Sequence, residues 1–271
     1  MTSGLKQNSA FRRAVLAFYK KHGRAHLPWR KTKNPYRILV SEIMLQQTQV
    51  GRVILYYEKF LRQFPTIHAL AKAPLSGVLI AWQGLGYNRR AKMLHQAARA
   101  IISKYGGKFP KEKDALMNLP GIGPYTAGAV RVFAFNEPEV LIETNIRSAY
   151  IHHFFAHRRK VGDRELLQLT IVPAKPSPRL WYSALMDYGS HLKSVTVNPS
   201  RRSAHHAKQK AFKGSDREIR GAILKILSRH AANEKGLSSL PFQKTRVREQ
   251  INALVREGLI QRRGNTYALS D

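Results

Sequence analysis

Short apolar patterns of helical period, each ended by proline or glycine, dominate residues 1–199. Apolar side chains recur three and four residues apart in the segments 10–20, 38–64, 66–73, 75–82, 89–105, 111–118 and 125–135. This is the period of a helix with one buried face. Proline and glycine punctuate the segments, as in APL, QGLGY and GGKFP, and such residues end helices. We therefore expect an all-α body of many short helices.

A different pattern follows this body. Residues 200–214 carry basic side chains without an acid and are typical of a linker. Beyond them, two helical patterns precede strand patterns at 259–263 and 266–269, which flank a Gly-Asn hairpin signal. This order predicts a winged-helix-like α/β module over 215–271, after a helical domain over 1–199. Such modules bind DNA or proteins, and the basic side chains favour DNA: Lys244, Arg246, Arg248, Arg262 and Arg263.

The charge balance indicates a polyanionic partner. The chain holds 47 Lys and Arg against 16 Asp and Glu, a formal net charge of +31. Such an excess of positive charge makes the chain repel itself, and it is typical of proteins that bind nucleic acids, whose phosphates neutralise the basic groups. The sequence shows no membrane anchor and no secretory signal, so we expect a soluble protein, cytoplasmic and nucleoid-associated in a prokaryote or nuclear in a eukaryote. We also expect a monomer. Zero cysteines exclude disulfides, thiolate metal sites and a cysteine nucleophile.

The string LPGIGPYTAG, residues 119–128, predicts a tight turn between two helices. Gly121 and Gly123 allow backbone N–H groups to approach a phosphate closely, at the positive end of the following helix. In a basic all-α chain, the string is typical of the helix-hairpin-helix motif. We therefore expect this hairpin to contact DNA.

Further strings resemble one family. These strings are LPWR (27–30), NPYRILVSEIMLQQTQV (34–50), WQGLGYNRRAKMLHQAA (82–98), GGKFP (106–110), LPGIGPYTAGAV (119–130) and MDYG (186–189). Residues 27–192 thus resemble the MutY-type adenine DNA glycosylases of the helix-hairpin-helix superfamily. The resemblance implies two helical lobes around a cleft and excision of a base flipped out of double-stranded DNA.

The resemblance also implies catalytic roles. Glu42 falls on the family's catalytic glutamate, which protonates the departing adenine; a base leaves poorly until it is protonated. Glu143 stands where the family has an aspartate that faces the developing oxocarbenium ion, one methylene longer here. On its isolated string, Glu42 is better interpreted as a helix-start carboxylate beside Ser41, and Glu143 has a surface acid as its alternative interpretation. Tyr125 occupies the position of the Schiff-base lysine of strand-cutting relatives, and a phenol forms no imine.

Other matched positions are expected to contact the DNA or the target base. Gln47 and Tyr87 match residues that wedge into the duplex beside the flipped nucleotide. Thr48 and Leu85 match residues that touch the opposite base. The base-pocket positions are Arg30, Ser183 and Asn145. Tyr87 and Tyr125 remain open to a second interpretation, as core aromatics.

The sequence departs from the family at three points, which concern the cofactor, the C-terminal domain and the base pocket. The family's four cluster cysteines are missing, so no iron–sulfur cluster is expected, and a monovalent cation at the hairpin is left open. Basic residues are expected to take over the DNA contact near the missing cluster: Arg201, Arg202 and Lys208. The family's C-terminal domain, which helps to recognise 8-oxoguanine, is replaced by the winged-helix-like module. Ser183 stands where the family often has Glu or Gln.

These observations predict a monofunctional DNA glycosylase of base excision repair. Adenine opposite 8-oxoguanine or guanine is the expected target. One alternative is another base, such as uracil, thymine or an alkylated base, on the same fold. A second alternative is a structure-specific DNA-binding protein without catalysis, although binding alone requires neither Glu42 nor Glu143.

Overall fold

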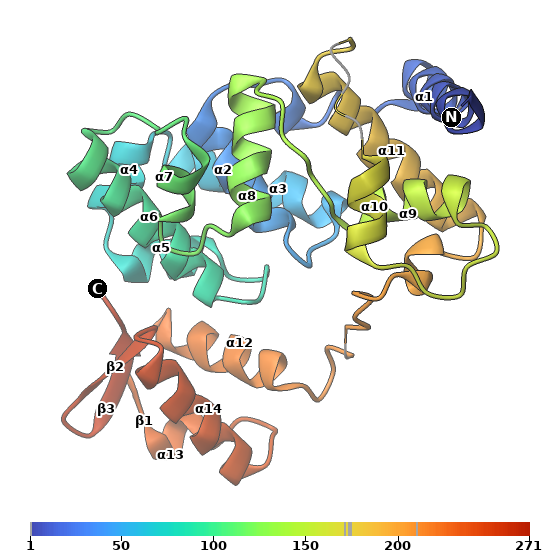
Figure 1. The fold of residues 1–271 in the computed structure, drawn as a ribbon. Coiled ribbons are helices and arrows are strands. Elements are labelled where there is room, and N and C mark those ends of the chain that lie inside the picture. Colours follow the sequence, from blue (N-terminus) through green and yellow to red (C-terminus); the bar gives the residue numbers. More distant parts are fainter. Residues whose placement is uncertain (1, 171, 173–174, 210) are drawn as a thin grey trace. The chain divides into compact units, whose positions relative to one another are not determined.

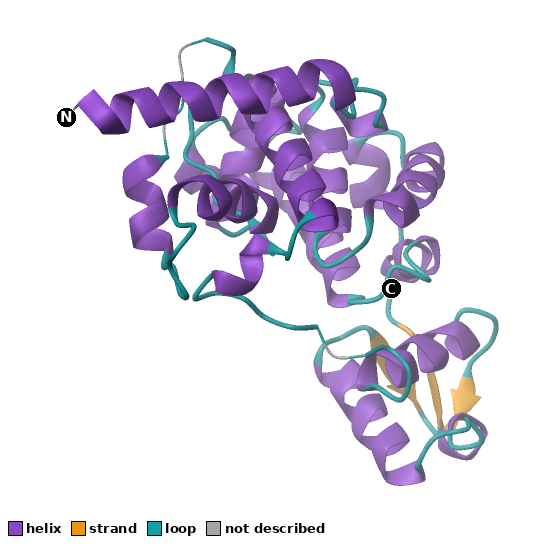
Figure 2. Cartoon of the chain, turned by 90° about the vertical axis from the view of Figure 1, so that its right-hand side faces the viewer, coloured by secondary structure: helices purple, strands orange, loops and turns teal. Residues whose placement is uncertain are grey.

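The computed structural model describes residues 2–170, 172, 175–209 and 211–271. Helices make up most of the described chain, and its strands lie near the C-terminus (Figure 1; Figure 2). No helix among the described residues is long and apolar enough to cross a membrane. The predicted all-α body with a small C-terminal α/β module is confirmed.

The chain forms two compact units, and each combines segments far apart in the sequence. The first unit joins Met1–Ile38 to Gly123–Lys208, and the second joins Leu39–Ile122 to Gln209–Asp271. The predicted boundaries 1–199, 200–214 and 215–271 stay a prediction.

The first unit is helical. Its elements are α1 (Thr2–His22), η1 (Pro28–Arg30), the first turn of α2 (Pro35–Leu45), α8 (Pro124–Val130), η2 (Arg131–Phe135), α9 (Thr144–Phe154), α10 (Asp163–Leu169), α11 (Pro178–Val195) and η3 (Pro199–Arg202). Helix α11 packs against both α1 and α9 (Figure 1). Aromatic side chains fill this contact: the ring of Phe11 lies 5.0 Å from that of Tyr150 and 6.1 Å from that of Trp181.

The second unit begins within α2 and continues through a group of helices. These are α3 (Val50–Gln63), α4 (Ile67–Lys72), α5 (Leu75–Ala81), α6 (Arg89–Tyr105) and α7 (Lys113–Met117). Their apolar spacing works as expected, since Val53, Tyr57 and Phe60 share the buried side of α3. The apolar pattern over 38–64 predicts one continuous helical segment, but the chain leaves the helix between Leu45 and Val50.

The C-terminal part of the second unit has a winged-helix-like order. It consists of α12 (Asp216–Leu227), β1 (Ala232–Asn233), α13 (Glu234–Leu237), α14 (Lys244–Arg256), β2 (Ile260–Arg263) and β3 (Thr266–Leu269). The strands form an antiparallel sheet in the order β1-β3-β2, next to α13 and α14 (Figure 1). The hairpin turn falls where the Gly-Asn signal predicts it, because Arg263 pairs with Thr266. Strand β1 was not predicted, since two residues show no periodicity.

This C-terminal module is bonded to the helices of its own unit. Lys92 Nζ donates to Glu257 O at 2.5 Å, and Gln83 Nε2 donates to Leu224 O at 3.2 Å. At the end of the chain, Ser76 Oγ donates to the Asp271 carboxylate at 2.6 Å. The module is therefore joined to α5, to α6 and to the loop between them.

Candidate active site and DNA-probing loops

Glu42 is a buried acid in the C-terminal half of α2. The exposed fraction of Glu42 is 8%, and its neighbours Ser41 and Ile43 are 1% and 3% exposed. Helix α2 starts much earlier, where Asn34 Oδ1 accepts a hydrogen bond from Arg37 N at 3.1 Å. The interpretation of Glu42 as a helix-start carboxylate is therefore wrong.

Two loops carry the predicted DNA probes, and each holds one residue in a costly backbone conformation. Gln47, in the loop after α2, has φ 55°, and Tyr87, in the loop before α6, has φ 48°. Left-handed backbone is uncommon outside glycine, and it persists only where the surroundings enforce it. Gln47 is exposed, Thr48 and Tyr87 are half-buried, and Leu85 is 4% exposed.

The guanidinium of Arg90 ties these two loops together. It donates to carbonyls at the end of α2 and in both loops, and to one hydroxyl: Ile43 O (2.8 Å), Met44 O (3.1 Å), Gln46 O (2.5 Å), Leu85 O (3.2 Å), Gly86 O (3.1 Å) and Thr48 Oγ1 (3.2 Å). Burial lowers the pKa of Arg90 to about 10, so it stays charged at neutral pH. The break between α2 and α3 follows from this contact, because carbonyls that end α2 find their donors on Arg90.

Substitution of Arg90 by lysine is expected to destabilise the protein. An ammonium has only three donors and lacks the planar fork that reaches two loops. Hydrogen bonds to a charged group contribute about 1.5–3 kcal/mol each, so losing more than one should cost at least about 2 kcal/mol. In a chain of this size, that lowers the melting temperature by about 4–8 °C. The matched control is Arg89→Lys, on an exposed side chain of the same helix; equal melting temperatures for both variants would contradict the role of Arg90.

The predicted hairpin lies between α7 and α8. Gly121 has φ 74°, and a Cβ there would lie 2.5 Å from Met93 Cβ, so this position requires glycine. Gly123 precedes α8 and is exposed. Tyr125 lies half-buried in the first turn of α8. The hairpin therefore presents exposed backbone at a helix start.

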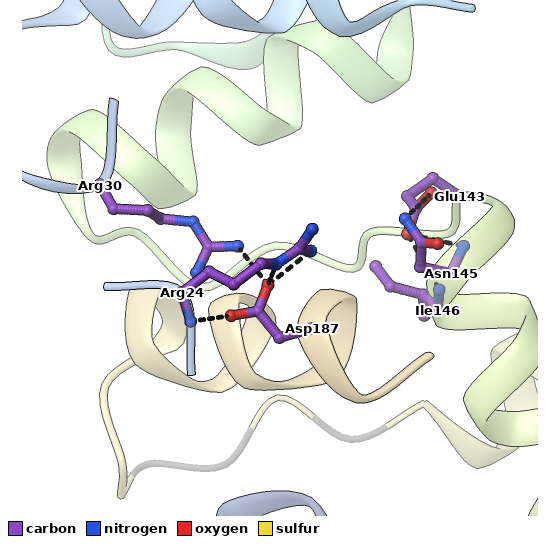
Figure 3. A network of polar contacts seen from close by, with 6 residues as sticks. All are labelled: Arg24, Arg30, Glu143, Asn145, Ile146 and Asp187. Atoms are coloured by element: carbon purple, nitrogen blue, oxygen red, sulfur yellow. Dashed lines mark hydrogen bonds and ion pairs between the residues drawn. The ribbon is translucent and has the colours of Figure 1, made fainter. Parts of the chain in front are cut away.

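Glu143 caps the N-terminus of α9. Its Oε1 accepts hydrogen bonds from Asn145 N (2.8 Å) and Ile146 N (2.9 Å), and its Oε2 accepts one from Asn145 Nδ2 (3.2 Å), as Figure 3 shows. The side chain is thus fixed and half-buried, unlike a solvated surface acid. Asn145, predicted in the base pocket, is a direct partner of Glu143.

Burial raises the pKa of Glu143 above its usual range. The two backbone N–H donors oppose this rise, and so do the positive charges of Lys193 and Arg147. Desolvation is the largest of these effects, so the net shift of the pKa is upward. Its ionisation is expected to matter for any chemistry near it.

A second polar centre of the first unit surrounds Asp187. Its carboxylate is 1% exposed and accepts from Arg24 N (2.7 Å), Arg24 Nε (2.9 Å) and Arg30 Nη2 (3.3 Å). Figure 3 shows both arginines pointing toward Asp187 from different segments. Among the described residues, Arg30 Nη1 is buried without a hydrogen-bond partner. A buried guanidinium N–H of this kind is available to a ligand.

The MDYG string also fixes the approach of α11 to α9. A Cβ at Gly189 would lie 1.9 Å from Asn145 O, so only glycine allows this contact. Ser183 is 3% exposed and lies one helical turn before Asp187, on the same side of α11. One helix thus supports the start of α9, where Glu143 lies, and holds Ser183 and Asp187.

The predicted basic contacts fall into two groups. Arg201, Lys208 and Lys244 are exposed. Arg246 and Arg248 lie in ion pairs, with Asp216 at 2.6 Å and with Glu234 at 2.7 Å. DNA binding by all of these residues stays a prediction.

Arg202 has a structural role that the sequence did not suggest. Its guanidinium donates to carbonyls at the end of α9, at Phe155 O (2.5 Å) and Ala156 O (2.9 Å) among others. In addition, Val161 N donates to Arg202 O at 2.8 Å. Arg202 therefore fastens the segment after α11 to α9. Among the described residues, no group of three or more His, Asp or Glu side chains could hold a metal ion.

Sequence reasoning missed Arg24, Arg90 and Asp187. Asp187 lies inside a matched string, and its position within an otherwise apolar helix pattern was a usable signal. Nothing in the sequence separates Arg90 from its neighbour Arg89, because only the folded chain shows which guanidinium is buried.

The family model that matches residues 40–174 is described as the HhH-GPD superfamily base excision DNA repair protein. Adenine DNA glycosylase of Mycolicibacterium smegmatis is 34% identical over 234 residues, which cover 79% of this chain and 78% of that protein. Adenine DNA glycosylase of Buchnera aphidicola subsp. Baizongia pistaciae is 39% identical over 182 residues, 66% of this chain. The chain spans about half the length of this second relative, 52%.

A solved structure has a similar fold. The structure of a thermostable thymine-DNA glycosylase superposes with a TM-score of 0.59 at 30% sequence identity. The match covers 68% of this chain and 87% of that one.

Proposed function

The chain belongs to the HhH-GPD superfamily of base excision DNA repair proteins, and on that premise we propose that it is a monofunctional DNA N-glycosylase. Its proposed target is adenine mispaired with 8-oxoguanine or guanine in double-stranded DNA. The similarity to adenine DNA glycosylases supports this choice of base, with 34% identity over most of both chains in one case.

The observation that carries the proposal is the burial of Glu42. This side chain is 8% exposed and lies in the region that matches the family model. A general acid must lie within reach of the base that it protonates, and a carboxyl group in a niche with little water can meet an extruded base there and give it a proton directly. A protein that merely binds DNA has no need of such a group in α2.

The proposed reaction is hydrolysis of the N-glycosyl bond. Glu42 gives its proton to a ring nitrogen of the flipped adenine while the bond between C1′ and the base breaks, and the bonding electrons leave with the base. Positive charge then develops on the sugar, where the Glu143 carboxylate stabilises it. Water adds to C1′ and releases a proton, which restores the acid. Tyr125 forms no imine, so the DNA strand stays intact.

The first unit contributes further proposed contacts to the base. Arg30 Nη1, which has no partner among the described residues, is suited to donate to an acceptor on the base. Asp187 holds the same guanidinium through Nη2 at 3.3 Å. Ser183 offers a hydroxyl on the same face of α11 as Asp187.

The proposed partner is lesion-containing or mispaired duplex DNA. The net charge of +31 supports binding to phosphates, and the exposed glycines of the hairpin support backbone contacts. Without cysteine, the chain has no thiolate ligands for an iron–sulfur cluster. We propose a monomer that acts without an organic cofactor, with a monovalent cation at the hairpin as a further feature of the same proposal.

A panel of duplexes tests the target base. Each duplex holds one mispair: adenine opposite 8-oxoguanine, guanine or cytosine, and thymine or uracil opposite guanine. After treatment with the protein, hot alkali cuts the strand at each abasic site. We expect cleavage of the adenine mispairs after alkali and intact strands without it. Strand cutting without alkali would contradict the role assigned to Tyr125.

One alternative target has its own support. The similar solved structure belongs to a thymine-DNA glycosylase, and the chain departs from the adenine-specific family at Ser183 and Glu143. Alkali-dependent cleavage of thymine or uracil opposite guanine, with adenine mispairs left intact, would favour this alternative. Tight binding with no cleavage of any duplex would leave a DNA-binding protein without catalysis.

A further inference from the structure

Two guanidinium groups of its own unit lie near the ring of Tyr87. Arg90 Cζ is 5.4 Å from the ring centroid, and Arg217 Cζ is 5.2 Å from it. The phenol oxygen accepts hydrogen bonds from Gln209 Nε2 at 2.7 Å and from Arg217 Nη1 at 3.1 Å. Tyr87 is thus held by its ring and by its hydroxyl group.

The two arginines come from different parts of the chain. Arg90 belongs to α6, and its other contacts tie the loop after α2 to the loop before α6. These two loops, which hold Gln47 and Tyr87, are called the probing loops below. Arg217 belongs to the first turn of α12, in the C-terminal module. Because Gln83 and Lys92 bond this module to the helices, Arg217 faces Tyr87 from an anchored element.

A pocket next to Tyr87 is lined both by residues of the two loops and by residues near the C-terminus. Its volume is about 810 Å³, and its lining includes Gln47, Thr48 and Leu85 from the probing loops. The C-terminal module contributes Arg217, Glu218 and Lys225, and the segment before it contributes Phe212. The residues predicted to read the duplex therefore share one cavity wall with the module.

We infer that Arg217 is a positioning residue, through which the C-terminal module fixes the Tyr87 ring before the duplex arrives. This inference rests on the proposed function, in which Tyr87 enters the base stack beside the flipped nucleotide. A cation over an aromatic face restricts the ring, and its hydrogen bond to the hydroxyl fixes the tilt. A wedge that is already ordered loses less conformational freedom on insertion, which favours base extrusion.

The test measures base extrusion apart from base excision. Duplexes carry the fluorescent base 2-aminopurine at the target position, and all proteins carry Glu42→Gln so that the base is retained. Arg217→Lys keeps the charge but loses the planar group, and Arg217→Gln loses both. Arg229→Gln removes the same charge from an exposed position of the module and is the matched control. A melting curve of each variant verifies folding.

We expect both Arg217 variants to lower the extrusion equilibrium about 3- to 30-fold, in line with one cation–π contact, and Arg229→Gln to leave it unchanged. In a Tyr87→Ala background, Arg217→Gln should cause no further loss, since a positioning residue acts only through the group that it positions. On a target opposite an abasic site, where less stacking must be broken, the loss should shrink.

Other results would overturn the inference. Normal extrusion by Arg217→Lys, with a lower salt dependence of binding in Arg217→Gln, would make Arg217 a phosphate contact. Faster or more complete extrusion by the Arg217 variants would show that Arg217 holds Tyr87 back from insertion and does not assist it. Additive losses in the Tyr87→Ala background would separate the two residues. If the protein with Glu42 intact excises no base while extrusion still depends on Arg217, the proposed function fails and the inference stands.

Discussion

Replacement of Glu42 by glutamine is expected to lower the single-turnover rate of base excision by about 10²- to 10⁴-fold, the usual contribution of a general acid. Glutamine has nearly the same shape and keeps a carbonyl oxygen and a polar end group. It has no acidic proton, however, so the base must leave as an anion. Because glutamine has nearly the volume of glutamate and carries no charge, the fold should tolerate this substitution even though Glu42 is only 8% exposed. Excision rates under enzyme excess and DNA dissociation constants measure the effect.

The matched control is Glu58→Gln, which removes one negative charge from an exposed position on α3. Both variants raise the net charge equally, so any change of DNA affinity from charge alone appears in both. We expect wild-type excision from the Glu58 variant and unchanged affinity in both. Wild-type turnover by the Glu42 variant would exclude the role of proton donor. Joint loss of binding and melting temperature would show instead that α2 needs the carboxylate for its structure.

The sequence predicts the helices well where local periodicity decides them. The bounds of α6 and β3 agree with their patterns, because each pattern is flanked by glycine or a turn signal. The segment 46–49 shows the limit of this reasoning. It contains no proline or glycine, and the apolar spacing continues across it, yet the helix ends at Leu45. The cause is Arg90, which takes the carbonyls of residues 43, 44 and 46.

The sequence likewise predicts one part of the candidate site and misses another. The resemblance to the family identifies Glu42, Tyr87 and Glu143 as positions of interest, because the chemistry of each side chain is visible in the sequence. The contacts that fix these groups are not visible there. Arg217 lies 130 residues from Tyr87 along the chain, and their pairing depends on the docking of a module that the resemblance does not cover. Partners of this kind follow only from tertiary structure.

Glu143→Gln is the second substitution with a large expected effect. The glutamine oxygen can still accept from Asn145 N and Ile146 N, so α9 keeps its cap. The negative charge near the developing oxocarbenium ion is lost, and removal of one such electrostatic contact lowers a rate by about 10²- to 10³-fold. Melting temperature, DNA affinity and single-turnover excision together separate this loss from misfolding.

The pH dependence distinguishes charge from shape. Burial raises the pKa of Glu143, so its carboxylate becomes protonated at a higher pH than an ordinary glutamate as the solution is acidified. Wild-type excision should therefore decline on the acidic side, and this decline should be missing from Glu143→Gln. Glu143→Asp is the control that keeps the charge on a shorter side chain, and it should lose much less activity than the glutamine variant. Equal losses for both variants, with the acidic decline intact, would mean that the reach of the side chain matters at this position and its charge does not.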